Sequence, residues 1–181
     1  MYGLETGYEK TGDFKIKSPA LIGKQADGKW EIKYFDVNWN QFWTWEDKGD
    51  GYYQIVNRRS KKCLEVDDKR LIYKNGAILQ QWSCYGNNNQ LWRKNYFPGG
   101  TFQIVNKKSK RCIDIPGWGK SNGVRLWQWR CLDQANQKWQ MHSNGLKNLD
   151  SHKCLDLPDH ELYNLECNNG NAFMLKKIID M

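Results

Sequence analysis

The sequence predicts an all-β fold in which three equivalent units close around a shared axis. Two observations support this prediction: one segment occurs three times, and each occurrence carries short apolar runs of alternating pattern. Residues 53–65 return as residues 102–114 with seven of 13 positions identical and the other six exchanged for a chemical equivalent. A weaker copy occupies residues 146–157. Units of this kind cannot bury an apolar face alone, so we expect them to pack against one another around one axis.

Each unit continues in the same order after this segment. In the first two units a tryptophan precedes the second cysteine by two positions, whereas the third has Leu165 there. An Asn-Gln-x-Trp box follows at residues 89–92 and 136–139, with a degraded version at residues 171–173. Clusters of Gly, Asn, Asp and Ser separate the apolar runs, which indicates about four short strands per unit and no helical period. The bulky residues of the boxes, expected near the axis, are Trp92, Trp139 and Phe173.

Length and composition limit the class of protein. The chain has 181 residues, of which 39% are apolar and 27% charged, and a formal net charge of +8. This length suits one domain with a small appendage and excludes a large multidomain enzyme. The composition is not that of a disordered chain, and no apolar run approaches the roughly 20 residues of a membrane-spanning helix. We expect an extension over residues 1–50 and the repeat domain over residues 51–181.

The extension contains a further Asn-Gln-x-Trp box at residues 40–43, in register with the box at residues 89–92. The last strand of the fold therefore has two candidates, residues 40–43 and residues 171–173. The box at residues 40–43 either closes the barrel in a circularly shifted arrangement, or ends an additional lost unit, or belongs to an aromatic docking surface. We favour closure. Residues 1–8 lack the basic start and apolar stretch of a secretory signal, so we expect that any such signal has been removed or replaced.

The repeated cysteines, acids and Gln-x-Trp boxes over residues 50–176 resemble the ricin B-type lectin family. The resemblance implies a β-trefoil, a carbohydrate-binding lectin without enzymatic activity or cofactor, and galactose-type or related glycans of glycoproteins or glycolipids as partners. The family often serves as the cell-binding part of a toxin or as the carbohydrate-binding module of a hydrolase, so a catalytic or structural protein partner is a further expectation.

The six cysteines allow 15 pairings, and the repeat selects one of them. Equivalent positions in the three units predict the local disulfides Cys63–Cys84, Cys112–Cys131 and Cys154–Cys167. Paired cysteines indicate an oxidising compartment, so we expect a secreted or extracellular protein. A zinc site is the weaker interpretation, because no Cys-x-x-Cys occurs and the three histidines lack ligand spacing.

The resemblance assigns a sugar pocket to each unit. A pyranose needs an aromatic plate under its apolar face and polar groups at its edge. In the second unit an acid accepts two hydroxyl hydrogen bonds and one tryptophan stacks on the ring; the residues are Asp114, Trp127, Trp129, Asn136 and Gln137. The first unit offers Glu65, Gln80, Trp82, Asn89 and Gln90. Its glutamate has one methylene more than aspartate, which shifts the carboxylate. The third keeps Asp156, has Leu165 at the stacking position and lacks the Asn-Gln pair, which predicts an inactive pocket.

Positive charge is concentrated in two equivalent turns. They contribute eight cations, which equals the net charge of the chain: Arg58, Arg59, Lys61, Lys62, Lys107, Lys108, Lys110 and Arg111. Solvated turns of this kind often only confer solubility. The alternative is a polyanion site, distinct from the neutral-sugar pocket, for sulfated or sialylated glycans or an anionic membrane surface. Nucleic acid is not the expected partner of an oxidised, secreted protein.

Two other functions remain open at this stage. The first alternative is a structural or assembly trefoil that has lost sugar binding. The second is a glycoside hydrolase whose carboxylate pair the sequence does not reveal. No phosphate-binding glycine loop, metal-binding histidine pair or Gly-x-Ser-x-Gly motif occurs. These observations favour the lectin.

Overall fold

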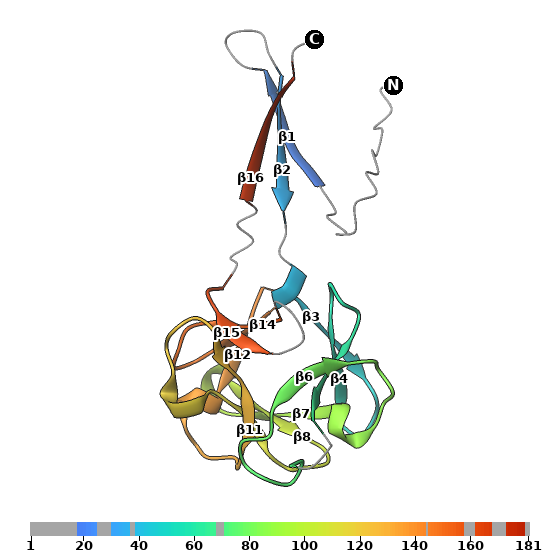
Figure 1. Ribbon diagram of the computed structural model, residues 1–181, viewed down its shortest axis with the longest axis vertical. Coiled ribbons are helices and arrows are strands. Elements are labelled where there is room, and N and C mark those ends of the chain that lie inside the picture. Colours follow the sequence, from blue (N-terminus) through green and yellow to red (C-terminus); the bar gives the residue numbers. More distant parts are fainter. Residues whose placement is uncertain are drawn as a thin grey trace. The chain divides into compact units, whose positions relative to one another are not determined.

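The computed structural model describes residues 18–24, 30–36, 39–67, 71–143, 145–157, 162–167 and 173–179 (Figure 1). The chain divides into two compact units, one formed by residues 38–170 and the other by residues 1–37 with residues 171–181. These boundaries differ from the division at residue 50 that we expected, because residues 39–50 belong to the larger unit and residues 171–181 do not.

The smaller unit is a three-stranded antiparallel sheet that joins the two ends of the chain. Its strands are β1 (Ser18–Lys24), β2 (Trp30–Asp36) and β16 (Phe173–Ile179), in the order β1-β2-β16. Strand β2 is central, and Phe173 pairs with Asp36 at the start of β16. Phe173, which we expected to belong to the repeat units, is therefore part of this sheet.

The larger unit has the three-fold arrangement of a β-trefoil, and its described residues contain short 3-10 turns but no α-helix. Its strands are β3 (Trp43–Asp47), β4 (Tyr53–Asn57), β5 (Cys63–Val66), β6 (Leu79–Trp82), β7 (Leu91–Tyr96), β8 (Phe102–Asn106), β9 (Cys112–Asp114), β10 (Val124–Arg125), β11 (Trp127–Trp129), β12 (Trp139–His142), β13 (Gly145–Asn148), β14 (Cys154–Asp156) and β15 (Tyr163–Leu165).

Two kinds of strand pairing build this unit. The barrel strands pair in the order β3-β4-β7-β8-β12-β13, all antiparallel. The hairpins β5–β6, β9–β11 and β14–β15 complete the three repeats. Where β13 approaches the start of β3, a Cβ atom on Gly145 would lie only 2.8 Å from the carbonyl oxygen of Gln41. Glycine at this position therefore permits the close approach of the first and last barrel strands.

Three tryptophans occupy equivalent places in the core. Trp43, Trp92 and Trp139 are at most 3% exposed. Their indole N–H groups donate to Leu155 O, Leu64 O and Ile113 O, at 3.2, 3.0 and 3.5 Å respectively. Each acceptor is the residue after the first cysteine of a repeat. Trp43, from the amino-terminal box, thus holds the position expected for Phe173, and the circularly shifted arrangement is the one observed.

The three disulfides link Cys63 to Cys84, Cys112 to Cys131 and Cys154 to Cys167, which is the pairing predicted from the repeat. Each ties the first strand of a hairpin to the chain just beyond the second strand. Loops of this size contribute about 3 kcal/mol each in the chain-entropy model. Among the residues described, no helix is long and apolar enough to cross a bilayer.

Candidate functional site

The second repeat brings its acid, its aromatic pair and its Asn-Gln pair together from three elements. Asp114 ends β9, and the antiparallel register places it opposite Trp127 in β11. Asn136 and Gln137 come from the 3-10 turn η5 (Ala135–Gln137). This turn precedes β12, so the core position of Trp139 fixes the two amides beside the carboxylate. All five residues that the sequence predicted for this pocket lie in this region.

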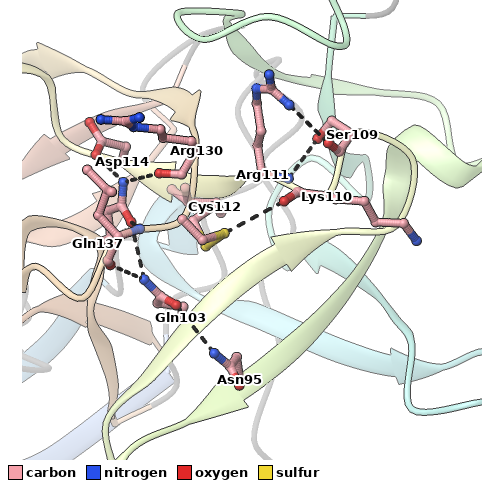
Figure 2. The surroundings of a disulfide bond; sticks show 12 residues. Asn95, Gln103, Ser109, Lys110, Arg111, Cys112, Asp114, Arg130 and Gln137 are labelled. Carbon is pink, nitrogen blue, oxygen red and sulfur yellow. Dashed lines mark hydrogen bonds between the residues drawn. A yellow bond between two sulfur atoms is a disulfide. The ribbon is translucent and has the colours of Figure 1, made fainter.

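The carboxylate of Asp114 is 5% exposed and already accepts three hydrogen bonds. The indole N–H of Trp127 donates to Oδ1 at 2.6 Å, and the amides of Gln137 and Asn136 donate to Oδ2 at 2.8 and 3.0 Å. Figure 2 shows Gln137 between Asp114 and the backbone of Arg130, to whose carbonyl oxygen it also donates. A carboxylate has about four acceptor positions. By this count one position remains, on Oδ1, for a hydroxyl donor; acceptance of two hydroxyls stays a prediction.

Burial also changes the acidity of this group. Desolvation raises the pKa of Asp114, and the hydrogen bonds from Gln137, Trp127 and Asn136 oppose that shift. A second acceptor of the pocket, Asn136 Oδ1, is buried and lacks a hydrogen-bond partner in the structure. Only the acceptor position left on Asp114 Oδ1 is counted for a ligand, and it suits one that donates a hydrogen bond, such as a hydroxylated ring.

The two tryptophans of β11 have different surroundings. Their rings are stacked at a centroid distance of 5.0 Å and an interplanar angle of 24°. Trp127 also lies close to Gly76 of the first repeat, where a Cβ atom would be 3.6 Å from the ring. Trp127, which the sequence assigned to sugar contact, thus orients the acid and supports its neighbour. Trp129 is half-buried and is the candidate plate.

The first repeat forms the same arrangement with glutamate as the acid. Gln80 donates to Glu65 Oε1 at 2.8 Å, and Gln90 donates to Oε2 at 2.8 Å. The extra methylene therefore preserves the bond from the Gln of the box, whereas the bond from Asn89 lengthens to 3.4 Å. Trp82, the candidate plate of this pocket, is 49% exposed. The two pockets differ mainly in the residue beside the plate, which is Gln80 here and Trp127 in the second repeat.

The third repeat contains the acid and the glutamine but no aromatic residue at the plate position. Asp156 is buried, and Gln41 Nε2 donates to its Oδ2 at 2.6 Å and to Glu166 O at 2.7 Å. The expectation that this pocket had lost its Asn-Gln pair is wrong, because residues 40–41 supply the pair from the other end of the domain. Leu165 stands where the other repeats have tryptophan, and the side chain of Tyr163 lies outside the described residues.

Gln41 and Asn40 are the site residues that sequence reasoning did not assign to a pocket. The signal for them was the register of the amino-terminal box. Burial raises the pKa of Asp156, while the hydrogen bonds from Gln41 and from the backbone of Leu157, together with the charge of Arg59, oppose the shift. The third pocket thus shares the buried acid of the second.

The basic turns are built identically and are fixed to the boxes. They and the equivalent turn of the third repeat each begin with an asparagine: Asn57, Asn106 and Asn148. Its side-chain oxygen accepts hydrogen bonds from the backbone N–H groups two and three residues ahead, at 3.0 and 3.1 Å. Its amide donates to the backbone oxygen of a box asparagine: Asn57 to Asn40 O, Asn106 to Asn89 O and Asn148 to Asn136 O. Each turn therefore adjoins a different pocket. The eight predicted polyanion residues lie in two of these turns, beside the third and the first pocket.

Among the residues described, no group of three or more His, Cys, Asp or Glu side chains could hold a metal ion. The first two repeats thus each combine a buried acid, a tryptophan and an amide pair, the arrangement expected for the lectin class. A family model described as ricin-type beta-trefoil lectin domain-like matches residues 39–126 and 94–166. These two overlapping segments cover more than half of the chain, which therefore belongs to this family.

Solved structures with the same fold include a designed three-fold symmetric protein, ThreeFoil, at 26% identity and a TM-score of 0.62, covering 73% of this chain and 100% of that chain. The exo-beta-1,3-galactanase 1,3Gal43A from Clostridium thermocellum matches at 18% identity and a TM-score of 0.62, over 90% of this chain and 46% of that chain. The Polyporus squamosus lectin bound to a Neu5Aca2-6Galb1-4GlcNAc epitope matches at 16% identity and a TM-score of 0.58, over 74% of this chain and 50% of that chain.

The chain thus spans half or less of the galactanase and of the Polyporus lectin. No curated protein matches the sequence. The family and the fold are those of carbohydrate-binding lectins, and the three disulfides and the lectin domain are consistent with an extracellular protein.

Proposed function

We propose that this protein binds galactose-type or related glycans of cell surfaces through the second pocket and, in addition, through the first. The observation that supports this proposal is the remaining acceptor position on Asp114 Oδ1, next to the stacked pair Trp127 and Trp129. A sugar ring stacked on Trp129 would donate one hydroxyl to the carboxylate. Asn136 would bind at the ring edge, and Gln137 would hold the acid in place from behind.

The pockets of such a lectin are shallow and individually weak. Two pockets on one rigid trefoil gain avidity when they bind neighbouring glycans on the same surface. Binding through two weak pockets suits a secreted protein. Such a protein would serve as the cell-binding part of a toxin complex, or as the binding module of a hydrolase carried on another chain. Support for a binding role over a catalytic one comes from the buried acids Asp114 and Glu65, each of which accepts three hydrogen bonds from amide or indole donors.

A glycan array with the purified chain tests the proposal. We expect galactose-terminated glycans to bind, and Trp129→Ala to lower the signal at least tenfold, because the variant removes the plate without opening the core. Tyr96→Ala is the matched control: Tyr96 is 66% exposed and lies in β7, a barrel strand. Its signal should equal that of the unmodified chain. No binding to any glycan would leave the scaffold as the function.

A further inference from the structure

The residue that follows the plate position differs in charge among the three repeats. In each hairpin the first cysteine pairs with the plate position, so one step further along the register two more residues lie across from each other. These pairs are Lys62 and Ser83 in the first repeat, Arg111 and Arg130 in the second, and Lys153 and Glu166 in the third. Two cations therefore face each other only in the second hairpin.

The third repeat shows that side chains at these two positions can meet, because Lys153 and Glu166 form an ion pair there. The second repeat has arginine at both positions. Among the described residues, no carboxylate forms an ion pair with Arg111 or Arg130. Like charges across a strand pair repel each other, and Figure 2 shows the two arginine side chains extending in different directions from the hairpin. The second hairpin thus lacks the anion that Glu166 supplies in the third.

Arg130 is fixed beside the second pocket through its backbone. It directly follows Trp129, and its carbonyl oxygen accepts a hydrogen bond from Gln137 Nε2 at 3.0 Å. The same Nε2 donates to Asp114 Oδ2 at 2.8 Å, so one side chain joins Arg130 to the acid of the pocket (Figure 2). The Arg130 residue itself is exposed. Its guanidinium is therefore available to a ligand that lies on Trp129.

Arg111 is held on the other side of this ladder by a loop of the first repeat. Its Nε donates to Asn75 Oδ1 at 3.0 Å, and its Nη1 donates to Ser109 O at 3.2 Å. Asn75 Oδ1 also accepts the backbone N–H of Arg130, at 2.8 Å. One asparagine thus joins the guanidinium of Arg111 to the backbone of Arg130. A guanidinium has five N–H donors, and these contacts use two of those of Arg111.

We propose that the second pocket takes an acidic saccharide, whose sulfate or carboxylate group binds at Arg130 and Arg111 while a sugar ring stacks on Trp129. The acidic group would take the place that the carboxylate of Glu166 has in the third repeat. This inference rests on the proposed lectin function and names the class of glycan. It differs from a separate polyanion site in the two basic turns, because Arg130 lies outside them and the acidic group belongs to the saccharide on the plate.

The test uses the full chain carrying Trp82→Ala, which inactivates the first pocket. Lactose, 3′-sulfolactose and 3′-sialyllactose are the probes in calorimetric or NMR titrations. We expect the sulfated or the sialylated probe to bind about three to ten times more tightly than lactose at low ionic strength, the range of one or two exposed ion pairs. The preference should disappear near 1 M salt, about where the Debye length falls to 3 Å. The two acidic probes separate sulfate from carboxylate recognition.

Matched substitutions in the same background assign the effect to Arg130. Arg130→Ser, which copies the first repeat, should remove most of the preference. Arg130→Glu, which copies the third, would pair with Arg111, and the acidic probes should then bind more weakly than lactose. Lys110→Gln removes one charge next to Arg111, but the Lys110 side chain extends away from Arg111 in Figure 2, so the preference should persist. Lactose is uncharged, and its affinity reports in each variant whether the pocket is intact.

The inference is overturned if the acidic probes bind no better than lactose in Trp82→Ala, or if Arg130→Ser and Lys110→Gln weaken them equally. Both results leave lactose binding, and therefore the lectin function, intact. Absence of binding by all three probes to the unmodified chain, together with an empty glycan array, would instead reject the proposed function itself.

Discussion

Trp43 should contribute as much to the stability of the trefoil as Trp92 and Trp139, although it lies outside the region that the sequence repeat marks as the domain. The side chain is 3% exposed and its indole N–H bonds Leu155 O at 3.2 Å. Truncation of a buried tryptophan to alanine costs about 3–5 kcal/mol, and the lost hydrogen bond costs about 1 kcal/mol more. We therefore expect Trp43→Ala to lower the free energy of unfolding by about 4–6 kcal/mol.

Urea unfolding with the disulfides intact measures this loss. With a slope of about 2 kcal/mol per molar urea, the midpoint should move by about 2–3 M. Trp92→Ala is the positive control, and Tyr85→Ala, at an exposed position of the trefoil, should leave the transition where it is. Trp43→Phe keeps most of the apolar volume and should cost no more than about 3 kcal/mol. A loss below about 1 kcal/mol for Trp43→Ala would refute the circularly shifted closure.

Further predictions concern the pockets and the barrel. Because the pKa of Asp114 is raised, its carboxylate takes up a proton at a higher pH than an ordinary aspartate, so glycan binding through the second pocket should weaken as the pH falls through that raised value. Between the ordinary pKa and the raised one the native state binds more protons than the unfolded state, so Asp114 should make the fold more stable, not less, over the same pH decrease, as parallel thermal unfolding can show. Gly145→Ala should destabilise the trefoil by about 1–3 kcal/mol in urea unfolding, because the new methyl group would contact Gln41 O at the barrel junction. Reduction of the Cys63–Cys84 disulfide, checked by mass spectrometry, should lower the stability of the first hairpin by about 3 kcal/mol and weaken binding through Trp82.

The sequence predicted the repeat architecture because each unit repeats the same cysteines, acid and box, and equivalent residues then have equivalent partners. Cys63, Cys112 and Cys154 illustrate this, since each pairs with the second cysteine of its own unit. The role of Trp127 could not be predicted, because a tryptophan near a sugar pocket can stack or donate. The position of the Trp127 ring depends on Gly76 of a neighbouring repeat, which packs against it, and on the hydrogen bond from its N–H group to Asp114.

In the third repeat a buried acid and a glutamine occur without an aromatic residue at the plate position. Gln41 bonds Asp156 and the backbone of Glu166, as Gln90 bonds Glu65 and Ser83 O and Gln137 bonds Asp114 and Arg130 O. These bonds join each hairpin to the barrel whether or not an aromatic plate is present. The acid–glutamine pair is therefore part of the architecture and would persist after binding is lost. The plate position makes none of these joining bonds, and the three units differ there, with Trp82, Trp129 and Leu165.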